Sequence, residues 1–285
     1  MRSLRAELVV VVFAGAACAE ARDTPREDAQ AQTAEPRAES QAVKTPATAV
    51  LVPANHTDIP VPPSCGPGMK LVPGGTLSTL ERGKDVTIAP FCLDEVEVDV
   101  RSWRACERAG GCPKLSSRTD WDNPDEDRIV SRFCNGGRSD VDDQPANCVS
   151  QEEASRYCAS GRKRLPTGDE WEWAARGGKD GRATPWGSPV ATDQICWGKP
   201  KKRTGTCARR SHALDVTPLG VHDLGGNVSE WVSPPSRSRN AAARWVYGAS
   251  WYAVDDGYAR AALGGVQTPA RRAETIGFRC AADAP

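Results

Sequence analysis

Eleven cysteines in a chain of 285 residues constrain the fold more than any other feature of the sequence. In a reducing cytosol, thiols persist mainly at metal or catalytic sites. This chain contains no C-x-x-C pair, and its three histidines are isolated from one another, so none of the usual zinc spacings is present. We therefore interpret the cysteines as a disulfide framework and expect the chain to fold in an oxidising compartment.

The first 18 residues have the pattern of an export signal. Arg2 and Arg5 form a basic start, residues 8–17 form an apolar core too short to span a bilayer, and small residues lead to Cys18. This end resembles a bacterial lipobox, in which Cys18 becomes the lipidated first residue. Removing Cys18 leaves an even number of cysteines that can pair completely. We predict a membrane-anchored lipoprotein of the bacterial cell envelope; the alternative is ordinary cleavage, giving a secreted or periplasmic protein.

Residues 19–64 differ in composition from the rest of the chain. They are rich in alanine, proline, glutamate, glutamine and threonine and contain no aromatic residue, which predicts a disordered linker. Residues 65–285 then form one folded domain. Nine tryptophans against four phenylalanines and two methionines favour a loop-rich domain with a core of large aromatic side chains. Because 37 basic residues balance 37 acidic ones, no basic excess indicates nucleic acid as a partner.

Three helices are predicted from their capping residues. Asp99 is a plausible N-cap for a helix over 100–109, and Ser150 and Thr167 each begin a capping-box pattern, for helices ending near 160 and 176. Strands are expected within 69–77, 86–98, 244–252 and 277–280, and residues 113–147 are expected to be turn-rich.

The stretch Asp223–Val232 combines a glycine pair with polar and aromatic side chains. Gly225 and Gly226 permit a backbone that other residues follow with difficulty, and Asn227 and Glu230 offer side-chain oxygens. Such a rigid turn is suited to a hard cation. The alternative is a glycine turn followed by an amphipathic strand.

Five separated segments share their order and spacing with one family. They are Gly161–Gly178, Pro185–Gly187, Gly225–Trp231, Gly248–Trp251 and Gly277–Cys280. Together they resemble the formylglycine-generating enzyme (sulfatase-modifying factor) family over about residues 65–283. The resemblance implies an α+β fold that is C-type-lectin-like, loop-rich and confined to a single disulfide-stapled domain.

The resemblance also implies ligands and disulfides. In the family the Asp223–Val232 stretch holds a structural calcium ion, through side chains matched here by Asn227 and Glu230 and a carbonyl matched by Val228. A second family calcium site falls in residues 190–210, where this chain carries a basic run and two cysteines instead, so we expect a Cys196–Cys207 disulfide there. Cys158 and Cys280 match a family disulfide. With 106–112 and 134–148 assumed as local pairs, Cys65 and Cys92 remain to form the fifth.

The catalytic members of the family oxidise a cysteine of a sulfatase to formylglycine with two cysteines that bind copper. Those positions are Ala253 and Tyr258 here. Soft Cu(I) requires sulfur ligands, so copper and this oxidation are not expected. Three histidines are also too few for the histidine cluster of the family's iron-dependent sulfoxide synthases.

The leading functional prediction is therefore a non-catalytic, exported binding module whose partner is an exported protein, a peptide or a glycan. The former active-site groove would be its contact surface, formed by Ser250, Trp251, Tyr252, Asp255, Asp256, Tyr258 and Arg260. One alternative is that the aromatic members pack in the core and the two aspartates only solvate a turn. Another is a divergent enzyme that acts on an exported protein, with the aspartates as an acid/base or metal pair.

Overall fold

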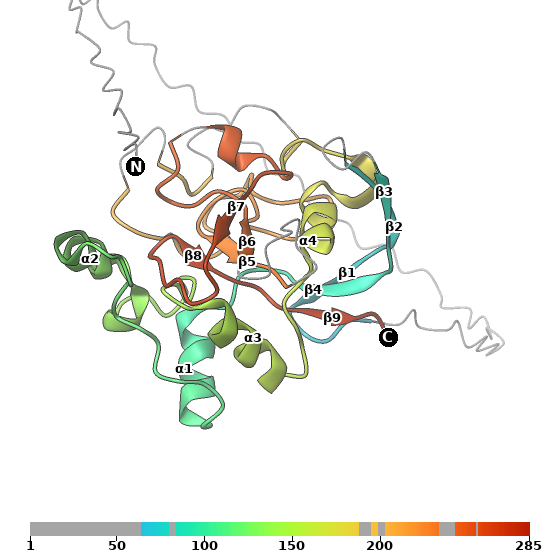
Figure 1. Ribbon diagram of the computed structural model, residues 1–285. Helices are drawn as coiled ribbons and strands as arrows, with labels where there is room; N and C mark the ends of the chain where they lie inside the picture. The colour runs from blue at the N-terminus through green and yellow to red at the C-terminus, as the bar shows by residue number, and fades with distance from the viewer. Residues whose placement is uncertain (1–63, 80–83, 188–194, 199–202, 234–242, 255) are drawn as a thin grey trace, which may run out of the picture. The chain divides into compact units, whose positions relative to one another are not determined.

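The computed structural model describes residues 64–79, 84–187, 195–198, 203–233, 243–254 and 256–285 (Figure 1). The chain divides into two compact units, 1–57 and 58–285, and all described residues belong to the second. The predicted export signal, Cys18 and almost all of the predicted linker therefore lie outside the described residues. Within the described ranges, no helix has the length and apolar character needed to cross a membrane.

The first sheet joins the beginning of the domain to its end. It contains β1 (Met69–Val72), β4 (Phe91–Asp94) and β9 (Ala281–Asp283) in the order β1-β4-β9, with both pairs antiparallel. Figure 1 shows the blue and red ends of the described chain meeting in this sheet. The strand that follows β1 in sequence, β2 (Gly75–Thr79), is not part of this sheet. It forms a separate hairpin with β3 (Lys84–Ile88).

The second large sheet lies at the centre of Figure 1. Its order is β7 (Gly264–Gln267), β6 (Arg244–Tyr247), β5 (Ser229–Trp231) and β8 (Ile276–Gly277), and only the β5–β8 pair is parallel. Every strand is short, so loops make up much of the domain. The predicted loop-rich α+β architecture is confirmed.

The three predicted helices begin at the predicted caps. In α1 (Val100–Arg108) the Asp99 side chain accepts the Ser102 N–H at 2.7 Å. Both α3 (Gln151–Ser160) and α4 (Gly168–Ala175) have complete capping boxes, starting from Ser150 and Thr167. Each cap satisfies backbone N–H groups that the helix itself leaves unpaired.

The region 113–147, expected to be turn-rich, also contains one helix that was not predicted. Helix α2 (Pro124–Val130) lies there, with Asn123 as its N-cap and Pro124 at its first position. Asparagine followed by proline is a helix-start signal that can be read from the sequence. Short 3₁₀ turns complete the structure: η1 (Ser131–Phe133), η2 (Asn135–Gly137), η3 (Gly178–Asp180) and η4 (Asp256–Ala259).

Tryptophans build the core, as the composition predicted. Trp103 and Trp231 lie in one buried cluster with Phe278, and Trp171 lies in a second with Tyr247. Each of these indoles donates its N–H to an acceptor, so burial leaves no unpaired donor; Trp231, for example, donates to the Val149 carbonyl at 2.8 Å.

Five disulfides join the ten cysteines of the domain, and each predicted pairing is confirmed. Cys158–Cys280 has the widest span, 122 residues, and ties α3 to the segment before β9. The pairs are 65–92, 106–112, 134–148, 158–280 and 196–207.

Candidate functional site

A buried ion pair lies at the centre of the domain. Glu230, on β5, is fully buried, and its carboxylate accepts hydrogen bonds from Arg279 Nε at 2.8 Å and Nη2 at 2.7 Å. The Trp171 indole donates a further bond at 2.8 Å. Arg279, also fully buried, additionally donates to the carbonyls of Asp94 and His222. One pair of side chains thus connects the central sheet, α4 and the β4 edge.

Two of the three residues predicted to hold calcium have protein partners in the structure. Glu230 directs both carboxylate oxygens at Arg279, a cation that already neutralises it. The Asn227 side-chain oxygen accepts the Cys207 N–H at 2.9 Å, and the Asn227 carbonyl accepts the Trp251 N–H at 2.8 Å. In this structure Glu230 is thus an ion-pair carboxylate and Asn227 holds neighbouring backbone, and the calcium site at Asn227, Val228 and Glu230 stays a prediction.

Three further buried carboxyl groups surround this pair. Burial raises the pKa of Asp215 to about 8, with the charge of Asp223 as a second cause, and burial raises the pKa of Asp223 to about 6. Burial and then the Asp223 charge also raise the pKa of Glu97 well above its ordinary value. Among the described residues, neither carboxylate oxygen of Glu97 has a hydrogen-bond partner. Arg279 lowers all three pKa values, so it is the shared counter-charge of the cluster.

The predicted groove residues are not all on the surface. Trp251 is only 2% exposed; its indole donates to the Glu274 carbonyl at 3.1 Å and its ring packs on Phe133. Ser250 is buried as well. The contact role predicted for these two residues is therefore corrected to a packing role, which was the alternative interpretation for Trp251.

Other members of the predicted groove do reach the surface. Tyr252 is 68% exposed, the neighbouring Val254 is 61% exposed, and Arg260 is exposed. Asp255 and the side chains of Asp256 and Tyr258 lie outside what the structure describes. Two exposed apolar side chains thus follow directly after a buried tryptophan.

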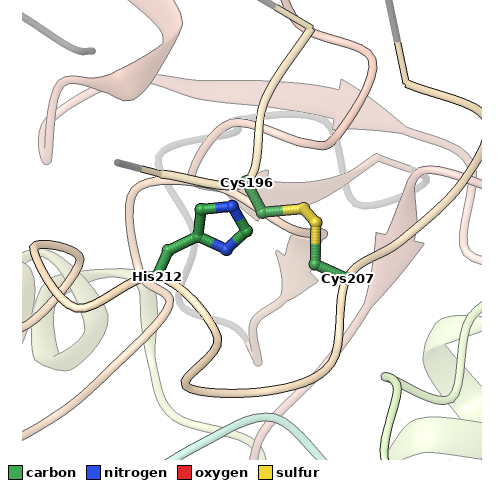
Figure 2. Close-up of side chains that lie close together, drawn as sticks. All are labelled: Cys196, Cys207 and His212. Carbon is green, nitrogen blue, oxygen red and sulfur yellow. A yellow bond between two sulfur atoms is a disulfide. The ribbon is translucent and has the colours of Figure 1, made fainter. Parts of the chain in front are cut away.

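Sequence reasoning missed a cysteine–histidine cluster, which lies near the turn that carries Tyr252. Figure 2 shows the three side chains of the cluster. Among the described residues, the Cys196 and Cys207 sulfurs and a ring nitrogen of His212 form the one group of potential metal donors lying within 4.8 Å of one another. The Arg203 guanidinium lies 3.2 Å from the Cys207 sulfur and 3.0 Å from His212 Nε2. The sequence signal for this cluster was the five-residue separation of Cys207 and His212. It was missed because, for histidine, only separations from other histidines were considered.

Comparison with known proteins decides the family. Residues 57–284 match the model of the sulfatase-modifying factor enzyme 1-like domain. The chain belongs to that family. Its relatives include the formylglycine-generating enzyme of Thermomonospora curvata, 27% identical over 81% of this chain and 99% of the relative. They also include the bovine inactive C-alpha-formylglycine-generating enzyme 2, 35% identical over 49% of this chain and 50% of the relative. The chain spans about half the length of the mammalian relatives that it matches.

Solved structures share the fold of this sulfatase-modifying factor domain. PvdO from Pseudomonas aeruginosa aligns with a TM-score of 0.56 at 23% identity, covering 75% of this chain and 94% of PvdO. CarF aligns with a TM-score of 0.55 at 20% identity, covering 76% of this chain and 98% of CarF. At these identities the likeness concerns the fold alone.

The sequence resemblance matches the family's two copper-binding cysteines to Ala253 and Tyr258 of this sulfatase-modifying factor domain. Ala253 replaces the first, and its carbonyl accepts the Gly198 N–H at 2.7 Å. A Cβ on Gly198 would lie 2.7 Å from that carbonyl oxygen, so only glycine permits this close contact. Because all ten cysteines of the domain are in disulfides, the described residues contain no free thiol.

A charged cavity of about 390 Å³ opens elsewhere, between α1 and the segment after β4. None of the described residues within 250–260 lines it. Each of its three cations is paired: Lys163 with Asp94 at 2.6 Å, Arg209 with Asp99, and Arg210 with Glu95 at 2.8 Å. This cavity is therefore separate from the Tyr252 turn.

Proposed function

We propose that this chain is an exported, non-catalytic binding module on the formylglycine-generating-enzyme fold, anchored to the bacterial cell envelope through Cys18. One observation carries the non-catalytic part. Ala253 and Tyr258 stand at the family's cysteine positions, and every cysteine of the domain is consumed in a disulfide. Without thiolates the domain has no ligand set for Cu(I) at that place. Relatives named as inactive formylglycine-generating enzymes support the same reading.

The binding surface would be the turn that exposes Tyr252 and Val254. The Trp251 N–H donates to the Asn227 carbonyl and the Ala253 N–H to the Ser250 carbonyl, so the turn is held on both sides of Tyr252. An exposed aromatic side chain on a rigid turn offers contact area at small entropic cost on binding. We infer that the partner is a peptide segment of an exported protein with an apolar side chain that packs against Tyr252 and Val254.

The non-catalytic proposal is tested by activity. The purified full chain is incubated with copper, oxygen and a peptide carrying a sulfatase cysteine motif, with the T. curvata relative as positive control. We expect the peptide thiol to survive quantitatively with this chain and to be lost with the relative. Turnover by this chain would contradict the proposal and favour a divergent enzyme.

The binding proposal is tested with a displayed library of random peptides. We expect selection on the full chain to enrich apolar motifs, and Y252A to weaken the selected peptides at least tenfold. Ile129→Ser is the matched control, because Ile129 is an exposed apolar residue on α2. Equal loss in both variants, or no loss in Y252A, would exclude the turn as the contact surface.

The anchoring proposal rests on the cysteine count. The ten cysteines after Cys18 pair with one another, which leaves Cys18 as the one cysteine outside the disulfides. In a bacterial host, we expect the wild-type chain in the membrane fraction and labelled by a fatty-acid analogue. Cys18→Ala should abolish the label and the membrane association; a labelled C18A variant would refute lipidation at this residue.

A further inference from the structure

We propose that Cys196, Cys207 and His212 form a redox-gated metal site. In the oxidised domain the two sulfurs are joined, and the site is closed. Once a thiol reductant opens this disulfide, two thiolates and an imidazole become available to one divalent ion of the zinc class. The sulfur and nitrogen donors already lie within 4.8 Å of one another, and Figure 2 shows the imidazole beside the disulfide.

The positions of both cysteines are held by contacts that do not depend on the disulfide. Asn227 donates its N–H to the Cys196 carbonyl at 2.7 Å, and its side-chain oxygen accepts the Cys207 N–H at 2.9 Å. A Cβ on Gly226 would lie 2.5 Å from the Cys196 carbonyl oxygen, so the two segments are also in close backbone contact. Reduction therefore releases the sulfurs but leaves their backbones in place.

The separation of the donors suits a tetrahedral ion. Zinc binds thiolate sulfur at about 2.3 Å and histidine nitrogen at about 2.0–2.1 Å, which places tetrahedral donors roughly 3.5–3.8 Å apart. The Cα atoms of Cys196 and Cys207 are 6.2 Å apart, so modest side-chain rotations separate the sulfurs by that amount. Two cysteines and one histidine leave a fourth position for water, a donor set known from catalytic zinc sites.

The Arg203 guanidinium lies against two of the three donors of this site. Its guanidinium contacts the Cys207 sulfur and His212 Nε2, and it also donates to the carbonyls of Ile195 and Trp197. Binding of an ion requires Arg203 to turn away from His212, which frees the nitrogen lone pair. The half-buried Cys207 and His212 give the ion a route to the buried Cys196.

Reduction and metal binding at this site require no protein group other than Cys196, Cys207 and His212. A dithiol reductant passes two electrons and two protons to the disulfide and is itself oxidised to a disulfide, leaving two thiols on Cys196 and Cys207. A divalent ion then displaces the two thiol protons, and two thiolates neutralise its charge.

The first test titrates Co(II) into the full chain before and after treatment with a water-soluble phosphine that is then removed. Alkylation and mass spectrometry report which disulfides have opened, and near-ultraviolet circular dichroism reports the fold. We expect one thiolate-to-cobalt charge-transfer site per chain in the reduced sample alone, displaced by zinc. C196S/C207S should abolish it, H212Q should weaken it at least tenfold, and C106S/C112S should leave it intact. A folded chain with the 196–207 pair open and no cobalt site would overturn the proposal, as would an equal site in C196S/C207S.

A second variant keeps the proposal testable if reduction unfolds the domain. Cys207→His leaves Cys196 as a permanent free thiol beside His212 and keeps the other four disulfides oxidised. We expect C207H to bind one Co(II) without any reductant, and C207H/H212Q to bind it at least tenfold more weakly. Failure of folded C207H to bind cobalt, or equal binding by both variants, would refute the site.

Discussion

Replacing Arg279 tests the central ion pair most directly. In R279M the guanidinium is lost, and the fully buried Glu230 carboxylate keeps only the Trp171 indole as a donor. Breaking a buried pair in this way costs about 3–5 kcal/mol. The carbonyls of Asp94 and His222 also lose a donor, at roughly 1 kcal/mol each. We therefore expect the free energy of unfolding to fall by about 5–7 kcal/mol, a large share of the ~5–15 kcal/mol typical of folded domains.

The measurement is urea unfolding followed by tryptophan fluorescence. The double variant E230Q/R279M removes both charges of the pair, so we expect it to be at least about 2 kcal/mol more stable than R279M. R128M is the control, because Arg128 and Asp125 form an ion pair with both side chains exposed, and it should change stability by less than about 1 kcal/mol. If R279M lost no more than R128M, or if the double variant gained nothing, the reasoning about a buried, mutually dependent pair would be refuted.

Two further predictions concern the acid cluster and the disulfides. The folded-state pKa of Asp215, about 8, lies above its ordinary value of 3.8, so the folded chain keeps a proton that the unfolded chain has lost. Stability should therefore fall between pH 4 and 8, by up to about 1.4 kcal/mol per pH unit. D215N should flatten this dependence in urea unfolding, and an unchanged slope would exclude Asp215 as its source. Replacing the Cys158–Cys280 pair with serines should cost about 5 kcal/mol, against about 2 kcal/mol for Cys106–Cys112, because the first closes a 122-residue separation and the second one of 6. Equal losses in thermal unfolding would contradict the loop-entropy argument.

Several features of the fold could be predicted because their causes are local in sequence. The caps Asp99, Ser150 and Thr167 bond to N–H groups three residues ahead, so the sequence alone locates the starts of their helices. Helix α2 carries an equally local signal in Asn123–Pro124, and it was missed because the surrounding polar residues were interpreted as turns.

The candidate site could be predicted only in part, because its contacts join residues far apart in sequence. The partner of Glu230 lies 49 residues along the chain, and a carboxylate in a glycine-rich turn has the same appearance whether it faces calcium or arginine. Burial of Trp251 depends on Phe133 and Glu274, which no pattern around residue 251 indicates.

By itself, the sequence determined the family, the helix starts, the even set of ten cysteines and the absence of thiols at 253 and 258. Helix caps are read from neighbouring positions. The even number of cysteines and the identities of residues 253 and 258 are read from the sequence directly. Only the tertiary structure decided that Glu230 is neutralised by Arg279, that Trp251 is buried while Tyr252 is exposed, and that His212 lies beside Cys196 and Cys207. Each of these depends on which distant side chain the packing brings within a few ångströms, where hydrogen bonds form and Coulomb energies are largest.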